Sequence, residues 1–344
     1  MILTPSGNFL VSEPSTTPNA GRVSFVTRGG VRRTLLDGLP TGIEVTMAGA
    51  SGPSAMALRE RTLYLAFGPG DSERRGPPPT SMHNPQGASS PIFSSILEFR
   101  FSVEPDSLAG AFRMTPAHQQ TLGDGGEVEL TDGSGGTARV SLLARFPVSE
   151  PSPNVVYRFS NPWGMALTKD GRSLYVTDAS TNALARIDTA TGRWRRITRF
   201  PPVSNPAPVG PPVIDIVPTS VRLYGDELLI SFLTGFPFAP GNARILSLNP
   251  ETGTTNPFIF GLTSATDVLW RMLPDGASQF FVLEFSANQS ASPAPPGRLL
   301  RFDASGMQVL AAPLITPVSM AYDEAAKELF ILELRGQILR LRLE

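Results

Sequence analysis

Four acidic residues stand at matching places along the chain, each directly after a short apolar run. They are Glu13, Asp178, Glu284 and Glu333. Carboxylates gathered at one rim could bind a cation or a polar ligand. Alternatively, each accepts backbone N–H bonds in the following turn, which is the ordinary use of Asp and Glu there. The sequence leaves both interpretations open.

The residue types present allow few kinds of nucleophilic catalysis. His83 and His118 are the two histidines, and the chain has no cysteine, so disulfides, thiolate metal sites and a cysteine nucleophile are excluded. A Ser-His-Asp triad is conceivable, but no Gly-x-Ser-x-Gly elbow accompanies it. We therefore expect both histidines to be loop residues and predict no catalytic residue.

The sequence contains a repeat of roughly 50 residues, and the acidic residues named above stand within its units. Each unit contains an apolar β-type run, and one step along the chain is about twice as long as the others. The six runs are Asn8–Glu13, Thr62–Phe67, Ser173–Asp178, Leu228–Phe232, Gln279–Glu284 and Glu328–Glu333. Strand-rich modules of this length predict an all-β fold, a six-bladed β-propeller with four-stranded antiparallel blades.

We place the blades within a single propeller domain that spans residues 1–344. The blade ranges are 1–40, 41–147, 160–202, 216–261, 265–312 and 316–344. The second is enlarged, because Gly68–Ser90 looks like a strandless loop and Leu108–Gln120 like a short helix. The sixth lacks an outer strand. Trp163 and Trp270 fall in expected inner strands, and we predict that both are core residues.

The amino-acid composition argues against two classes of partner, nucleic acids and membranes. The net charge is −1, from 29 basic and 30 acidic residues, so no bulk field favours nucleic acid or an anionic membrane. No apolar run is long enough for a membrane span. The start at Met1–Gly7 lacks the basic and apolar regions of a signal peptide, which we expect to have been removed or not included. We expect a monomer.

Proline-rich and phenylalanine-rich connections form a further pattern. Arg145–Pro151 is echoed by Arg199–Pro206, and Phe236–Pro240 and Pro293–Pro296 show the same bias. By strand connectivity these loops share one face of the predicted ring. Proline stiffens a loop and phenylalanine supplies apolar contact area, so this mouth favours an apolar or aromatic ligand or an extended peptide.

Several blocks in order resemble the ScyD/ScyE family. They are Asn161–Ala166, Thr177–Ala179 with Asn182–Leu184, Val217–Val221, Leu233–Phe238, Gly261–Thr263 and Val282–Glu284. The resemblance implies an NHL-like six-bladed propeller of bacterial origin, mostly secreted or periplasmic. Founding members are associated with scytonemin biosynthesis, and the family has no established reaction.

Gluconolactonase- and regucalcin-like propellers, which use calcium or zinc, provide the alternative reading. Their metal ligands lie near the starts of inner strands, which correspond here to Ser54, Trp163, Thr219, Asp267 and Val318. Only Asp267 is a strong ligand type, with Asn161 two residues out of register. We therefore predict no cofactor, and keep a divalent-metal hydrolase as the alternative.

The leading hypothesis is a non-catalytic extracytoplasmic module that binds a small apolar or aromatic ligand, or a protein partner, at the loop-rich mouth. The candidate ligand-binding residues are Asn161, Asp178, Asn182, Thr219, Phe236, Phe238, Asp267 and Glu284.

Overall fold

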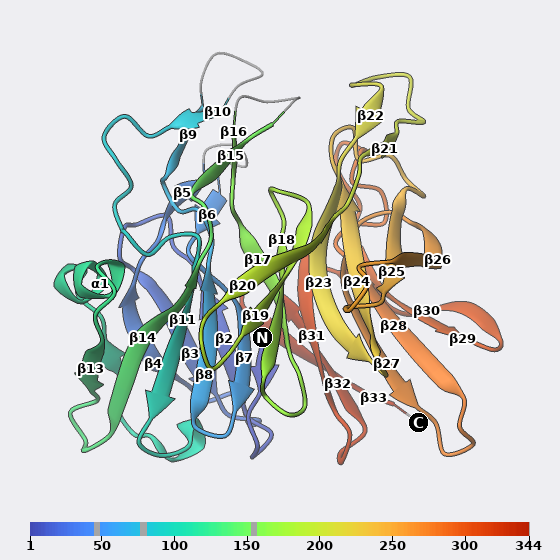
Figure 1. The fold of residues 1–344 in the computed structure, drawn as a ribbon. Coiled ribbons are helices and arrows are strands. Elements are labelled where there is room, and N and C mark those ends of the chain that lie inside the picture. Colours follow the sequence, from blue (N-terminus) through green and yellow to red (C-terminus); the bar gives the residue numbers. More distant parts are fainter. Residues whose placement is uncertain (45–48, 76–80, 153–156, 344) are drawn as a thin grey trace. The chain divides into compact units, whose positions relative to one another are not determined.

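The protein is a six-bladed β-propeller, as the repeat predicts (Figure 1). The computed structural model describes residues 1–343, apart from 45–48, 76–80 and 153–156. The chain divides into two compact units, one of Met1–Thr181 with Arg186–Arg195 and one of Asn182–Ala185 with Arg196–Glu344.

The first blade is a five-stranded sheet with the order β1-β2-β3-β4-β12. Its strands are β1 (Ile2–Leu3), β2 (Phe9–Glu13), β3 (Gly21–Val26), β4 (Arg32–Leu39) and β12 (Phe112–Arg113). Strand β12 comes from the second-blade insertion and runs parallel to β4. Gly38 permits this approach, because at its φ of +68° a Cβ would lie 2.2 Å from the Met114 carbonyl oxygen.

The second blade has the order β13-β14-β11-β8-β7 and is enlarged, as predicted. Its strands are β7 (Pro53–Arg59), β8 (Thr62–Phe67), β11 (Ser95–Phe101), β13 (Val128–Thr131) and β14 (Thr137–Arg145). The predicted helix is present but shifted. A 3₁₀ turn at Pro105–Ser107 and strand β12 come first, so α1 spans Pro116–Gly123. Thr115 and His118 cap its start reciprocally, which gives His118 a structural role.

Two-stranded hairpins stand outside the blades, and the sequence pattern missed them. In the first unit they are β5 (Gly42–Glu44) with β6 (Gly49–Ser51), β9 (Glu73–Arg75) with β10 (Ser81–His83), and β15 (Ser149–Pro151) with β16 (Tyr157–Phe159). The expectation of a strandless loop over Gly68–Ser90 is therefore wrong. Strands of three residues are too short to show an alternating pattern.

The third and fourth blades each have four strands in sequence order. The third contains β17 (Pro162–Leu167), β18 (Ser173–Asp178), β19 (Ala183–Asp188) and β20 (Trp194–Arg199). The fourth contains β23 (Ile216–Tyr224), β24 (Glu227–Thr234), β25 (Ala243–Leu248) and β26 (Thr255–Leu262), preceded by the hairpin of β21 (Val203–Ser204) and β22 (Val213–Ile214).

The fifth blade has four strands and the sixth has three. The fifth contains β27 (Ala265–Met272), β28 (Ser278–Glu284), β29 (Gly297–Asp303) and β30 (Gly306–Leu314). The sixth contains β31 (Pro317–Asp323), β32 (Glu328–Glu333) and β33 (Gln337–Arg342). No outer strand of the sixth blade is found among the described residues, as the sequence indicated.

Apolar side chains pack between the faces of successive sheets. Leu229 and Ile245 of the fourth blade join Val268 and Val282 of the fifth in one buried cluster. Trp270 packs against this cluster and donates its indole N–H to the Leu223 carbonyl oxygen at 2.7 Å, which agrees with its predicted core role. Trp163 is 45% exposed, so the same prediction for Trp163 is wrong.

A bulge interrupts the start of five inner strands at matching places. The pairing skips Trp163 in β17, Thr219 in β23, Thr266 in β27 and Val318 in β31, and it is similarly irregular after Pro53 in β7. The extra residue re-aims a side chain at the end of the strand. In the fifth blade it is Thr266 and not Asp267 that matches the other positions, so the sequence alignment there is wrong by one residue.

Candidate functional site

An exposed apolar surface lies at one end of the fourth blade. Strand β24 ends at Thr234, which pairs with Ile216 at the start of β23, so the loop after β24 and the β21–β22 hairpin before β23 share that end (Figure 1). We call this area the Phe236 surface. It comprises the hairpin tip 205–213 and the loop 235–240.

The loop 235–240 holds its two phenylalanines in fixed positions. The Gly235 N–H donates to the Asp215 carbonyl oxygen at 2.9 Å, and the Phe238 N–H donates to the Gly235 carbonyl oxygen at 3.0 Å. The rings of Phe236 and Phe238 meet edge to face with centroids 6.2 Å apart. Phe236 is 61% exposed, and Phe238 is half-buried with a φ of +59°. A bulky residue rarely adopts this left-handed backbone, which marks the loop as constrained.

Asn205 organises the hairpin tip beside this loop. Its amide nitrogen Nδ2 donates to the carbonyl oxygens of Val209 and Pro211, both at 2.8 Å. Val209 and Val213 are 58% and 41% exposed. The tip is close to the aromatic loop, since a Cβ on Gly210 would lie 3.3 Å from the Phe236 ring. The surface therefore combines exposed apolar side chains with backbone that is tied down.

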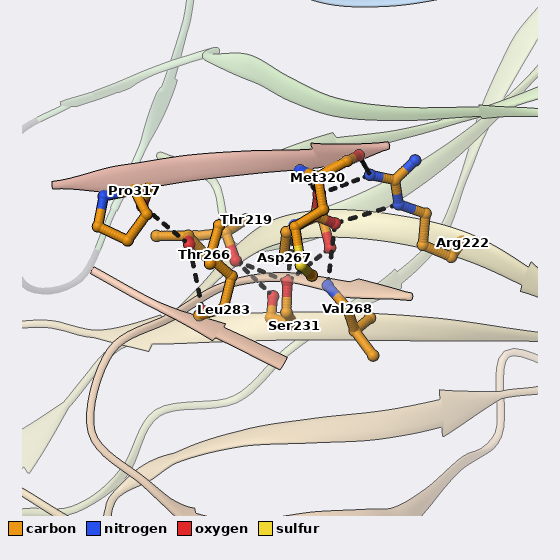
Figure 2. Close-up of polar contacts among 10 residues, drawn as sticks. Thr219, Arg222, Ser231, Thr266, Asp267, Val268, Leu283, Pro317 and Met320 are labelled. Atoms are coloured by element: carbon orange, nitrogen blue, oxygen red, sulfur yellow. Dashed lines mark hydrogen bonds and ion pairs between the residues drawn. The ribbon is translucent and has the colours of Figure 1, made fainter. Parts of the chain in front are cut away.

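Asp267 lies in a buried polar network of the second unit (Figure 2). Its carboxylate accepts from Arg222 through Nε at 3.1 Å and Nη2 at 2.6 Å. The backbone N–H groups of Val268 and Met320 donate to it at 2.9 and 2.8 Å. Arg222 Nη2 also donates to the Met320 carbonyl oxygen at 3.0 Å. Each Asp267 oxygen thus accepts two hydrogen bonds, and the network ties together β23, β27 and β31.

Hydroxyl groups at the inner-strand bulges join neighbouring blades. Thr219 Oγ1 donates to the Ala265 carbonyl oxygen at 2.9 Å and contacts Ser231 Oγ at the same distance (Figure 2). Thr266 Oγ1 donates to the Pro317 carbonyl oxygen at 3.3 Å. In the first unit, Ser54 Oγ donates to the Pro162 carbonyl oxygen at 2.7 Å. These bonds account for Thr219 as a link between blades.

Three of the four carboxylates that close second strands, those of Asp178, Glu284 and Glu333, accept backbone N–H groups, whereas Glu13 pairs with Arg32 at 2.6 Å. Glu284 is fully buried and accepts from the Thr263 N–H at 2.6 Å and from Arg298 Nε at 2.5 Å. Glu333 accepts from the Ile315 N–H at 2.6 Å. The donors to Glu284 and Glu333 precede the inner strand, whereas the sequence interpretation placed the donors in the turn that follows. That interpretation holds for Asp178, which accepts from Thr181 in the turn after β18.

Asn161 and Asp178 meet in the first unit. Asp178 accepts from the backbone N–H groups of Asn161 at 3.0 Å and Thr181 at 3.1 Å. Burial raises the pKa of the Asp178 carboxyl, and these hydrogen bonds oppose the shift. Asn182 belongs to the second unit, where its carbonyl oxygen accepts from the Phe200 N–H at 2.7 Å.

His83 lies in an aromatic cluster of the first unit. Its ring meets those of Tyr157 and Phe159 edge to face at 4.9 and 5.0 Å, and Ser149 Oγ lies 2.9 Å from its Nε2. This exposed Ser–His pair fastens the β9–β10 hairpin to β15–β16. Sequence reasoning missed this pair, because Ser149 and His83 are 66 positions apart along the chain.

The second unit places Thr219 and Asp267 in two separate hydrogen-bonded groups that lie near each other (Figure 2), and it brings Phe236 and Phe238 together. Sequence reasoning missed Arg222, whose place within an apolar strand gave no signal of its partner. Among the described residues, no group of three or more His, Asp or Glu side chains is arranged to hold a metal ion. No described helix is long and apolar enough to cross a membrane.

Neither a protein-family model nor a curated protein matches this chain. Solved structures similar to it include hydrazine synthase of Kuenenia stuttgartiensis, with 14% identity, a TM-score of 0.49, and coverage of 96% of this chain and 72% of that one. A 6-phosphogluconolactonase described as putative from Bacteroides uniformis has 11% identity, a TM-score of 0.48, and coverage of 100% and 80%. The periplasmic gluconolactonase PpgL of Pseudomonas aeruginosa has 13% identity, a TM-score of 0.47, and coverage of 92% and 70%. Similarity at this level carries no argument about function.

Proposed function

We propose that this protein is a non-catalytic binding propeller whose working surface is the Phe236 surface. The ligand class that fits best is a small apolar or aromatic molecule, with a protein partner as the second class. The observation that carries the proposal is the exposure of Phe236, Val209 and Val213 on loops whose backbone is hydrogen-bonded in place.

Energetics support an apolar occupant. Leaving large apolar side chains in water is unfavourable, and their burial by a ligand recovers roughly 25 cal/mol for each Å² removed from water. Because the two loops are already ordered, binding costs little conformational entropy. Exposed prolines at 206, 208, 211 and 212 add rigid apolar surface to the hairpin tip.

The candidate carboxylates support a binding role over hydrolysis. Asp267 has both oxygens engaged by Arg222 and backbone N–H groups, so the guanidinium already supplies its positive partner. Asp178 and Glu284 are enclosed and accept backbone N–H groups. The donor set is therefore a poor fit to a divalent cation, and the metal-dependent hydrolase is the weaker candidate.

We further propose that the chain is a secreted or periplasmic member of the ScyD/ScyE family. Its support is the ordered series of sequence blocks, of which Leu233–Phe238 is the most specific. That block forms the end of β24 and the first part of the aromatic loop.

A fragment screen tests the proposed surface. We expect aromatic fragments, observed by ligand-detected NMR, to bind the wild-type protein and to lose binding when Phe236→Ala and Phe238→Ala are combined. Met272→Ala is the matched control, because Met272 is also 61% exposed in the same unit. Fragment binding that survives the double substitution, or that falls equally with Met272→Ala, would show that this surface is not the site.

A further inference from the structure

Among the described residues, the sheet of the sixth blade has one strand fewer than those of the fourth and fifth blades. In the fourth and fifth blades the third strands, β25 and β29, are covered on their outer side by β26 and β30. Strand β33 occupies the same third position, and its sheet ends there among the described residues. The outer edge of β33 therefore has no strand paired with it in the part of the chain that the structure describes.

The backbone of β33 presents free hydrogen-bonding groups at this outer edge. The Leu343 N–H donates to the Lys327 carbonyl oxygen at 2.9 Å, which sets the alternation of the antiparallel pairing. Leu339 and Leu341 therefore direct their backbone groups toward β32. Ile338, Arg340 and Arg342 direct theirs outward, where no strand is paired with them in the described chain. Such an edge is a ready template for another strand.

Side-chain exposure agrees with a missing neighbour. Leu339 is 37% exposed, whereas Leu300, which stands at the matching register of the fifth blade, is 2% exposed. Ile338 is half-buried, whereas its counterparts Ile245 and Leu299 are completely buried. The apolar positions of β33 are thus less covered than those of strands that have an outer neighbour.

The positive charge of the β33 edge favours an acidic strand as its partner. Among the described residues, Arg340 and Arg342 share one nearby carboxylate, Glu328, at 3.9 and 3.6 Å, and both arginine side chains are largely exposed. A second copy of β33 paired antiparallel about Arg340 or Leu341 would set arginine opposite arginine, which is unfavourable. A strand that carries carboxylates would instead find an opposite charge.

We propose that β33 is a docking edge for an extended strand of a partner protein, in which Asp or Glu alternates with β-branched apolar residues. The partner strand adds as the fourth strand of the sixth blade. Its backbone pairs with Ile338, Arg340 and Arg342, its carboxylates lie beside the two arginines, and its apolar side chains cover Leu339. This interaction is separate from the Phe236 surface.

Hydrogen exchange with a defined probe tests the proposal. The probe is the acetylated and amidated hexapeptide Glu-Val-Glu-Val-Glu-Val, and the control peptide has Lys in place of Glu. With the Glu peptide at saturation, the exchange rates of the Ile338, Arg340 and Arg342 amides should fall to about one tenth of their values without peptide, or lower. The amides of Leu339 and Leu341 should already be slow without peptide.

Two variants separate backbone pairing from charge. Ile338→Pro removes an outward N–H while it keeps both arginines and the bonds to β32, so it should abolish binding of the Glu peptide. Combined Arg340→Glu and Arg342→Glu should lower the affinity for the Glu peptide roughly tenfold and raise the affinity for the Lys peptide. The control is combined Lys169→Glu and Arg172→Glu, which changes charge equally in a turn of the third blade. Circular dichroism checks that each variant is folded.

Three results would overturn the proposal. One is absence of Glu-peptide binding by the folded wild-type protein. Another is slow exchange of the Ile338, Arg340 and Arg342 amides in the protein without peptide. Slow exchange at all protein concentrations would mean that the chain itself covers the edge of β33. Slow exchange only at high protein concentration would mean that a second copy covers it. The third is equal binding of the Lys peptide.

Discussion

Replacement of Asp267 by asparagine should destabilise the protein strongly, because the carboxylate is the counter-ion of Arg222. Asp267 is 2% exposed and accepts four hydrogen bonds, two from the guanidinium and two from backbone N–H groups. Asparagine keeps the shape but removes the charge, and its NH₂ group would face donors. Removal of one partner of a buried ion pair costs about 3–5 kcal/mol.

The lower end of that range applies here. The Arg222 side chain is 27% exposed and can be partly hydrated once its partner is lost. We therefore expect Asp267→Asn to lower the free energy of unfolding by about 3 kcal/mol, measured by urea denaturation. Asp226→Asn, in an exposed turn of the fourth blade, is the control and should cost less than about 0.5 kcal/mol.

A double substitution isolates the pair. Combined Arg222→Met and Asp267→Leu places apolar side chains of similar size at both positions and leaves no charge unpaired. It should recover only part of the loss, because the Val268 and Met320 N–H groups still lose their acceptor. The effect should be the same in calcium and in EDTA. A cost below about 1 kcal/mol for Asp267→Asn, or a calcium-dependent gain in wild-type stability that this substitution removes, would refute the structural assignment.

Three further predictions concern stability. Thr219→Val removes the hydroxyl that joins β23 to the Ala265 carbonyl and should cost about 1–2 kcal/mol in urea denaturation, and a neutral result would contradict the link. The raised pKa of Asp178 means that its contribution to stability is fully present below the ordinary aspartate pKa and is lost as pH rises through the raised value. Asp178→Asn should therefore flatten the decline of the urea midpoint from pH 4 upward, and an unchanged pH profile would argue against it. Gly38→Ala forces a Cβ to within 2.2 Å of the Met114 carbonyl oxygen and should cost about 2 kcal/mol more than Gly30→Ala, whose surroundings are open although its φ is also positive. Equal costs would mean that β12 does not constrain β4.

The repeat of apolar runs was enough to predict the blades, because each run is a second strand buried on both faces. The third blade shows this best, where Leu174–Thr177 lies within the buried strand β18. The three-residue strands of the β9–β10 hairpin escaped notice because they are too short to show a period. Trp163 was assigned to the core because local pattern does not reveal which side of a bulge faces solvent.

The site was harder to read from sequence for two physical reasons. The bulge in β27 shifts its register by one residue, so Thr266, rather than Asp267, takes the position expected for a ligand. Arg222 is separated from Asp267 by 45 positions, and only folding brings the guanidinium to the carboxylate. The aromatic loop was recognisable because phenylalanine and proline alternate within a few residues, although its contact with the hairpin at Gly210 is again a product of folding.

The most direct measurement of the proposed binding function is residue-resolved mapping of an aromatic fragment by backbone NMR. Our expectation is that the largest chemical-shift changes fall on Val209, Gly210, Val213 and Phe236–Phe238. Changes concentrated instead around Arg222, Asp267 and Met320, and dependent on added calcium, would contradict it and favour a metal-dependent site.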